Sequence, residues 1–193
     1  MAAAGVVLLA LVACSTDETD VAVAPSSDTG APTTAASLDF AELIDDVTPL
    51  AEPLGWEVQR AYRVDAAIVS REGVLVNIYL RPSGEDASPD EYLADATTAL
   101  QVMAADVFAA DPSVSAIDVC LQRPNDEPPE VAVAPALRIL AYRDGLEPLL
   151  DTELRPADLV RLSRERRLVI YLDEYVEQSA DWADALAAGT TVP

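Results

Sequence analysis

The sequence predicts an α+β fold in which an antiparallel sheet of about four to five strands carries helices packed on one face. Three observations predict it. Residues 74–80 alternate with the two-residue period of a strand. Residues 88–108 combine the start signals and the apolar spacing of a long helix. Apolar residues make up 51% of the 193 residues, which is enough for one buried core.

A first helix is expected to begin near Asp39, because Asp39 and Glu42 have the spacing of a capping box. The Pro49–Pro53 region and Gly55 are expected to end it. Its apolar face is formed by Phe40, Leu43, Ile44 and Val47.

Strands are expected next. Trp56–Val64 is the first, and Ala66–Ser70 with Val74–Leu80 is expected to form a hairpin about residues 71–73. In the second arm, Val74, Val76, Ile78 and Leu80 share one face, and Leu75, Asn77 and Tyr79 share the other.

A long helix follows, with Ser88 as N-cap, Pro89 in the first turn and Glu91 completing a capping box. It is expected to run to about Phe108 and to stop before Asp111-Pro112-Ser113. The residues that it should bury are Leu93, Ala96, Leu100, Met103 and Val107.

A second hairpin is expected from Val114–Leu121 and Val131–Arg143, with Pro135 placing the return strand at an edge or a bulge. The remainder is predicted to be helical from Pro156 to about Val176, with a last amphipathic piece around Trp182 and Leu186. Residues 168–172 fit a strand as well, so helix and strand both stay open there.

The composition excludes whole mechanisms. The chain has no histidine, and all twelve of its basic residues are arginine. Without histidine there is neither a Ser-His-Asp site nor a histidine-bound zinc, and without lysine there is no Schiff base. We expect no metal and no cofactor. The net charge of −22 repels phosphates, so nucleic acid is not an expected partner.

The N-terminus has the pattern of a targeting signal. Residues 2–13 are uninterrupted apolar residues, about the length of a signal-peptide core and too short to span a bilayer. They end in Leu11-Val12-Ala13-Cys14, which resembles the lipobox of bacterial lipoproteins. The alternative is a buried helix with an incidental cysteine. Because no basic residue precedes Arg60, we expect translation to start upstream of Met1.

The resemblance implies that Cys14 receives acyl chains after cleavage of residues 1–13, and that these chains hold the protein on the outer face of the cell membrane. Residues 14–36 then form the lipidated cysteine and a polar tether, rich in Ser, Thr, Asp and Pro. Residues 37–193 form a single α+β domain.

Arginines gather between residues 155 and 167. Arg161, Arg164, Arg166 and Arg167 are the candidate docking residues for an acidic partner or an anion. The alternative is that they pair with the acids of their own domain.

Other candidates have ordinary structural interpretations. Cys120 is either a reactive thiol or a small side chain packed beneath a helix. Carboxylates gather in residues 85–91 and 126–130 without the pattern of a calcium loop. Trp56 and Trp182 are either stacking surfaces for a ligand or core residues.

We therefore expect a lipid-anchored extracytoplasmic domain that binds or assists another envelope protein and does not catalyse a reaction. The alternative is a module that binds a lipid, a sugar or a cation between sheet and helices. A hydrolase using carboxylates is the third hypothesis.

Overall fold

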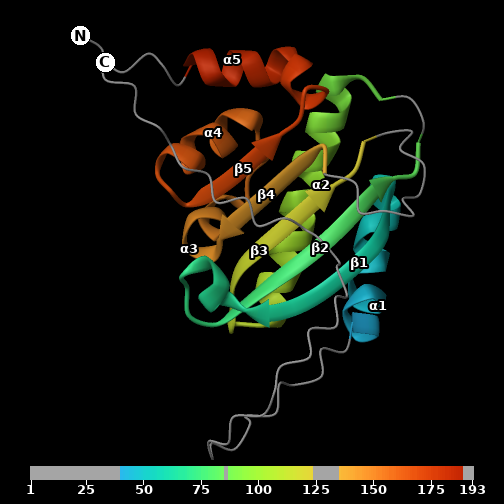
Figure 1. The fold of residues 1–193 in the computed structure, drawn as a ribbon, viewed down its shortest axis with the longest axis vertical. Helices are drawn as coiled ribbons and strands as arrows, with labels where there is room; N and C mark the ends of the chain where they lie inside the picture. Colours follow the sequence, from blue (N-terminus) through green and yellow to red (C-terminus); the bar gives the residue numbers. More distant parts are fainter. Residues whose placement is uncertain (1–39, 85–86, 124–134, 189–193) are drawn as a thin grey trace, which may run out of the picture.

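The computed structural model describes residues 40–84, 87–123 and 135–188. They confirm an α+β fold: a five-stranded sheet with strand order β1-β2-β3-β4-β5 and a long helix, α2, crossing one face (Figure 1). The strands are β1 (Trp56–Asp65), β2 (Val74–Pro82), β3 (Val114–Leu121), β4 (Leu137–Tyr142) and β5 (Leu168–Leu172). The helices are α1 (Phe40–Ala51), α2 (Pro89–Ala110), α3 (Arg143–Leu146), α4 (Pro156–Arg164) and α5 (Ala180–Ala188).

One strand pair departs from the expected antiparallel sheet. β1–β2, β3–β4 and β4–β5 are antiparallel, whereas β2 and β3 are parallel. The reason is the connection: α2 carries the chain back along the sheet, so that β3 starts at the same end as β2.

Helix α2 follows the prediction closely. The Ser88 hydroxyl accepts from the Glu91 N–H at 3.3 Å, and the Glu91 carboxylate accepts from the Ser88 N–H at 2.9 Å. This is the predicted capping box. The helix ends at Ala110, two residues beyond the predicted end, and all five residues expected on its apolar face are buried.

The expected strand at 66–70 is wrong. Ala66–Val69 is a 3-10 helix, because the Asp65 carboxylate accepts from the Ala67 N–H at 2.8 Å and turns the chain. The partner of β2 in the hairpin is therefore β1, from Asp65↔Val74 to Trp56↔Pro82.

The continuous helix expected from 156 to 176 is also wrong. Helix α4 ends at Arg164, and residues 168–172 form the edge strand β5. The alternative reading as a strand is the one that holds. The β4 strand begins at Leu137, and residues 131–134 of the expected strand lie outside the described residues.

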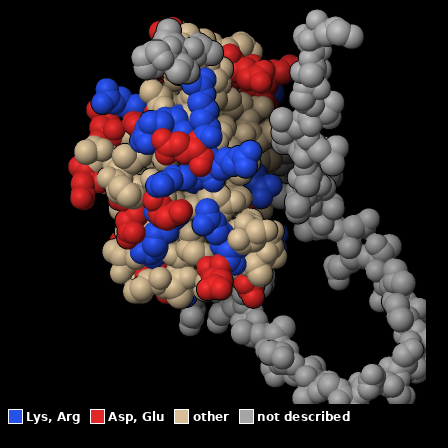
Figure 2. Space-filling model, turned by 90° about the vertical axis from the view of Figure 1, so that its left-hand side faces the viewer, with Lys and Arg blue, Asp and Glu red and all other residues tan. Residues whose placement is uncertain are grey.

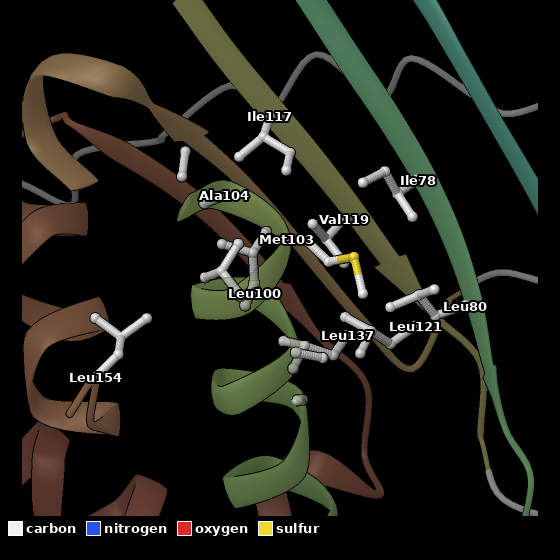
Figure 3. Close-up of a cluster of buried hydrophobic side chains, with 14 of the residues drawn as sticks. Ile78, Leu80, Leu100, Met103, Ala104, Ile117, Val119, Leu121, Leu137 and Leu154 are labelled. Carbon is white, nitrogen blue, oxygen red and sulfur yellow. The ribbon is translucent and has the colours of Figure 1, made fainter. Parts of the chain in front are cut away.

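The core lies between α2 and the inner face of the sheet. Figure 3 shows Met103 and Leu100 of α2 directed at side chains of β2, β3 and β4. Ile78, Leu80, Ile117, Val119, Leu121 and Leu137 contribute the sheet side, and all of them are fully buried. The interface between α2 and the sheet is therefore filled by apolar side chains.

Two polar side chains attach α2 to the rest of the fold. At its C-terminal end, the Arg143 guanidinium donates to the carbonyls of Phe108 at 2.9 Å, Asp111 at 2.7 Å and Val114 at 2.6 Å. Gln101, in the middle of α2, bonds three backbone groups of the segment before α4, namely the carbonyls of Leu150 and Thr152 and the N–H of Leu154. These bonds satisfy backbone groups that no helix or strand pairs.

Candidate functional site

Helix α4 presents the arginines that the sequence singled out. Pro156 occupies its first turn, and the Asp158 carboxylate accepts from the Arg155 N–H at 3.2 Å. Its buried side consists of Leu159, Val160 and Leu162. The other side therefore faces solvent and carries Arg161 and Arg164, with Glu165 just beyond the last turn.

The chain leaves α4 through a Schellman turn. The N–H of Arg167 bonds the carbonyl of Leu162 at 2.9 Å, and the N–H of Arg166 bonds that of Ser163 at 3.1 Å. Arg166 occupies the left-handed position of this turn, with φ of 60°. Glycine is the usual residue there, because a side chain is strained in that conformation.

The structure brings the four predicted arginines together at the C-terminal end of α4. Arg161 lies 3.5 Å from Asp158 and 3.4 Å from Glu165. Arg167 lies 3.9 Å from Glu165 and donates to the Asp144 carbonyl at 3.0 Å. Arg164 donates to the Leu186 carbonyl at 3.4 Å. The Arg166 side chain has no hydrogen bond or ion pair with the described residues.

Two further arginines join this surface, and sequence reasoning missed both. Arg71, from the turn before β2, lies 3.8 Å from Asp144 and stacks over Tyr142 at 4.3 Å. Arg143 in α3 pairs with Glu147 at 3.0 Å. Figure 2 shows blue arginine side chains, interspersed with red acidic side chains, on the side of the molecule that lies to the left in Figure 1. We call Arg71, Arg143, Arg161, Arg164, Arg166 and Arg167 the arginine face.

A glycine lets α3 approach the start of β5 closely. A Cβ built on Gly145 would lie 2.5 Å from the Cβ of Arg167, which is closer than atoms can pack. Gly145 therefore fixes the distance between α3 and Arg167. The close approach at Gly145 brings α3, which carries Arg143, next to the end of α4, which is followed by Arg166 and Arg167.

The acids of this surface do not neutralise it fully. The Arg161 and Arg167 side chains are 47% and 48% exposed, and their ion pairs are longer than 3.3 Å. Exposed pairs of this kind stabilise by about 0–1 kcal/mol. Each guanidinium also has five N–H donors. A carboxylate or phosphate of a partner can replace these weak contacts with bidentate ones.

A second polar group lies on the sheet face opposite α2. Asp118 of β3 is buried, and Arg138 of β4 holds its carboxylate with Nε–Oδ1 of 3.0 Å and Nη2–Oδ2 of 2.6 Å. Cys120 is buried beside them, with Sγ 4.0 Å from Asp118 Oδ1. The expected position of Cys120 beneath a helix is therefore corrected: its side chain shares the face of Asp118, away from α2.

Asn77 of β2 lies next to Asp118 in the register and is 5% exposed. Its Nδ2 has no hydrogen-bond partner within residues 40–84, 87–123 and 135–188. An unpaired buried amide costs about 1–3 kcal/mol, so it marks a position where an acceptor oxygen would be favourable.

The remaining candidates have structural roles. Asp90 accepts from the Ser179 hydroxyl at 2.6 Å, and this hydrogen bond lowers the pKa of Asp90 below its ordinary value of 3.8. The hydrogen bond from the Ser88 N–H likewise lowers the pKa of Glu91 below 4.5. Trp56 and Trp182 are buried in the core. Residues 85–86 and 126–130 lie outside the described residues.

No group of three or more acidic or cysteine side chains is placed to hold a metal ion within residues 40–84, 87–123 and 135–188. In the same part of the chain, no helix is long and apolar enough to cross a membrane. Cys14 and the lipobox-like segment lie outside the described residues. No protein-family model matches this chain, and neither the curated proteins nor the solved structures contain a match to it.

Proposed function

We propose that this protein is a lipid-anchored extracytoplasmic domain that binds an acidic partner protein of the cell envelope and catalyses no reaction. Acyl chains on Cys14 would hold it on the outer face of the membrane. The observation that carries the proposal is the arginine face: six of the twelve arginines of a chain with net charge −22 come from α3, α4, the turn after α4 and the turn before β2, which are linked by contacts at Asp144 and Glu165. A local patch of opposite sign orients a protein toward a complementary partner.

The filled core favours binding through the protein surface and argues against an internal pocket. Leu93, Leu100 and Met103 of α2 have no exposed surface and belong to the core cluster. Figure 3 shows Leu100 and Met103 beside the side chains of the sheet. A ligand between α2 and the sheet would have to displace these side chains. Each large core side chain contributes about 2–5 kcal/mol to stability.

The partner would engage the arginine face through carboxylates. Arg166 is the strongest candidate contact, because its guanidinium bonds none of the described residues and would give up no such contact on binding. Arg161 would exchange its long contacts with Asp158 and Glu165 for shorter, bidentate ones. The anchor would confine both proteins to one membrane surface and so raise their effective concentration.

The proposal is tested in intact cells by fractionation and cross-linking with mass spectrometry. Wild type should fractionate with membrane, and Cys14→Ser should not. Arg161→Glu with Arg166→Glu should lose a cross-linked envelope protein that wild type retains. The matched control is Arg60→Glu with Arg81→Glu, which makes the same charge change on β1 and β2. Equal loss in both double variants would contradict the proposal, because net charge alone would then explain it.

A small-ligand site is the second candidate function, and the unpaired Asn77 amide favours it. Because Nδ2 is a donor, it fits an acceptor oxygen of a sugar or a lipid carboxylate and not a cation. Millimolar N-acetylglucosamine or dodecanoate should then raise the melting temperature of wild type but not of Asn77→Leu. Without ligand, Asn77→Leu should be neutral or stabilising, since it removes the unpaired amide. Equal shifts in both proteins would exclude this site.

A further inference from the structure

Strand β5 forms one edge of the sheet (Figure 1), and its outer backbone groups bond no residue of the described part of the chain. At its two ends the chain bonds the β4 side: the Arg167 carbonyl accepts from the Tyr142 N–H, and the Asp173 N–H donates to the Ala136 carbonyl. Backbone groups of a strand alternate in direction, so odd positions between 167 and 173 face β4 and even positions face away. The outward groups belong to Leu168, Ile170 and Leu172, which have no hydrogen bond on that side to any described residue.

The two edges of the sheet differ in how well they are protected against pairing with a further strand. β1, at the opposite edge, carries four charged side chains and a register shift between Val58 and Arg60. Charges and bulges of this kind discourage pairing with another strand. The β5 sequence LVIYL carries no charge. Val169 and Tyr171 are 51% and 43% exposed beside this edge.

We propose that β5 pairs antiparallel with β5 of a second copy of the chain, about a two-fold axis at Ile170, so that two five-stranded sheets become one. The register follows from the unpaired groups. Residue 170 meets residue 170, and residue 168 meets residue 172 of the second copy. All these positions direct their backbone groups outward on both strands, which an antiparallel ladder requires.

Charges at the ends of β5 make the strand complementary to itself. Arg166 and Arg167 precede it, and Asp173 and Glu174 follow it. The two-fold axis at Ile170 places the basic end of one copy against the acidic end of the other. Asp173 and Arg167 already contact Arg123 and Glu165. Arg166 and Glu174 have no side-chain partner among the described residues, so they are the pair that the second copy supplies. The second copy and the proposed acidic partner would therefore compete for Arg166.

The side chains between these charges also match. Val169 of one copy lies opposite Tyr171 of the other on the outer face, and the pair occurs twice by symmetry. A branched aliphatic residue beside an aromatic one is a favourable cross-strand pair. A second copy therefore satisfies the backbone, the exposed apolar side chains and the terminal charges together. A heterologous peptide would have to reproduce all three features.

Sedimentation equilibrium of the full chain tests the proposal. Cys14→Ser serves as the background, which removes acylation and keeps the outcome independent of the proposed anchor. The background protein should show a monomer–dimer equilibrium, and Val169→Lys should weaken it at least about tenfold. Ile68→Lys is the matched control, since Ile68 is 70% exposed and belongs to the 3-10 helix Ala66–Val69, outside the β5 edge. A background protein that stays monomeric up to about 1 mM would overturn the proposal, and the flanking charges would then act only against aggregation.

Charge reversal tests the pairing of the strand ends. Arg166→Glu would place a second carboxylate opposite Glu174, and Glu174→Arg would place a second guanidinium opposite Arg166, so each variant alone should dimerise about tenfold more weakly. An equimolar mixture should recover the affinity as a heterodimer. A mixture that associates no better than the separate variants would contradict the register.

Disulfide trapping tests the register directly. Residues 169 and 171 of the two copies form a non-hydrogen-bonded pair, whose Cα separation of about 4.5 Å suits a disulfide. When Val169→Cys protein is mixed with Tyr171→Cys protein under mild oxidation, the mixed disulfide should exceed both homodisulfides. Cys120 is buried and should not compete. A statistical mixture of the three disulfides would exclude pairing about Ile170.

Discussion

Arg138 holds the buried carboxylate of Asp118 across the β3–β4 pair, with its Nε and Nη2 each bonded to the carboxylate. Asp118 is 1% exposed, whereas the Arg138 side chain is 31% exposed. The arginine therefore connects a buried charge to the surface. This ion pair lies on the face of the sheet opposite α2, where Asn77 is its neighbour on β2.

Replacing Arg138 with methionine should destabilise the protein by about 3 kcal/mol, because the Asp118 carboxylate would stay buried without its partner. Urea unfolding monitored by tryptophan fluorescence measures the change. Arg81→Met is the control. Its contact with Glu57 is 4.0 Å long and exposed, so its loss should cost less than about 1 kcal/mol. Equal losses would show that the Asp118 pair contributes no more than a surface contact.

Replacing Arg143 with lysine should destabilise the protein by about 2 kcal/mol. A single ammonium group cannot reach the three carbonyls that the Arg143 guanidinium bonds at the end of α2. The same unfolding measurement tests this. Arg63→Lys should change stability little, since Arg63 is half-exposed and lies 3.5 Å from Asp111. If Arg143→Lys left stability unchanged, a positive charge near the end of α2 would be sufficient for stability, without the three hydrogen bonds.

The free energy of unfolding should decrease at acidic pH, because protonation of Asp90 removes a stabilising contribution. The Ser179 hydroxyl lowers the pKa of Asp90 below 3.8 in the folded protein, so the unfolded chain binds the proton more tightly. The stabilising contribution is complete above the unfolded pKa of 3.8 and is lost as the pH falls through the lower pKa of the folded protein. Melting temperatures between pH 6 and pH 3 should show a smaller acid loss for Ser179→Ala than for wild type. Ser83→Ala, an exposed serine in the loop after β2, should follow wild type.

Replacing Gln101 with leucine should free the segment before α4. Gln101 bonds the carbonyls of Leu150 and Thr152 and the N–H of Leu154, and these groups would lose their partners. We expect a loss of about 1–2 kcal/mol and faster hydrogen exchange at the Leu154 amide. Gln59→Leu, at an exposed position of β1, should leave that amide protected. Unchanged exchange at Leu154 would show that the segment is held by its apolar contacts.

Replacing Arg166 with glycine should raise stability by about 1 kcal/mol, because glycine adopts the positive φ of this turn without strain. The same change should weaken binding to the proposed acidic partner. Arg164→Gly is the opposite control: within α4 it should lower stability by about 1 kcal/mol. If Arg166→Gly stabilises the fold and leaves partner capture intact, Arg166 is not a contact of the partner.

The sequence predicted α2 and the faces of β2 correctly, because both depend on residues close together in the chain. The capping box at Ser88 and the apolar spacing to Val107 place α2 within two residues of its observed end. Alternation placed Val76, Ile78 and Leu80 on the core side of β2. These features depend on contacts between residues close in the chain, which a pattern of side chains records.

The predictions failed where contacts between residues distant in the sequence determine the local structure. Residues 66–70 read as a strand from their apolar side chains, but the Asp65 cap and the pairing of β1 with β2 exclude it. At 168–172, pairing with β4 selects the strand over the helix. The sequence grouped the arginines of α4, but it held no signal that Arg71 would join them. Asn77 was placed on the outer face of its strand, but its missing partner depends on β3.

The parallel pairing of β2 with β3 has a consequence for the order of folding. The β1–β2 hairpin closes a short loop, with Asp65 opposite Val74. In the β2–β3 pair, Val74 meets Val114 and Leu80 meets Leu121, about forty residues along the chain. Closing that distance costs more chain entropy and requires α2 to be in place. The sheet therefore consists of two antiparallel halves, β1–β2 and β3–β4–β5, that can form separately and join last at this seam. Substitutions along the seam should slow folding in proportion to their effect on stability only if the seam is formed in the transition state.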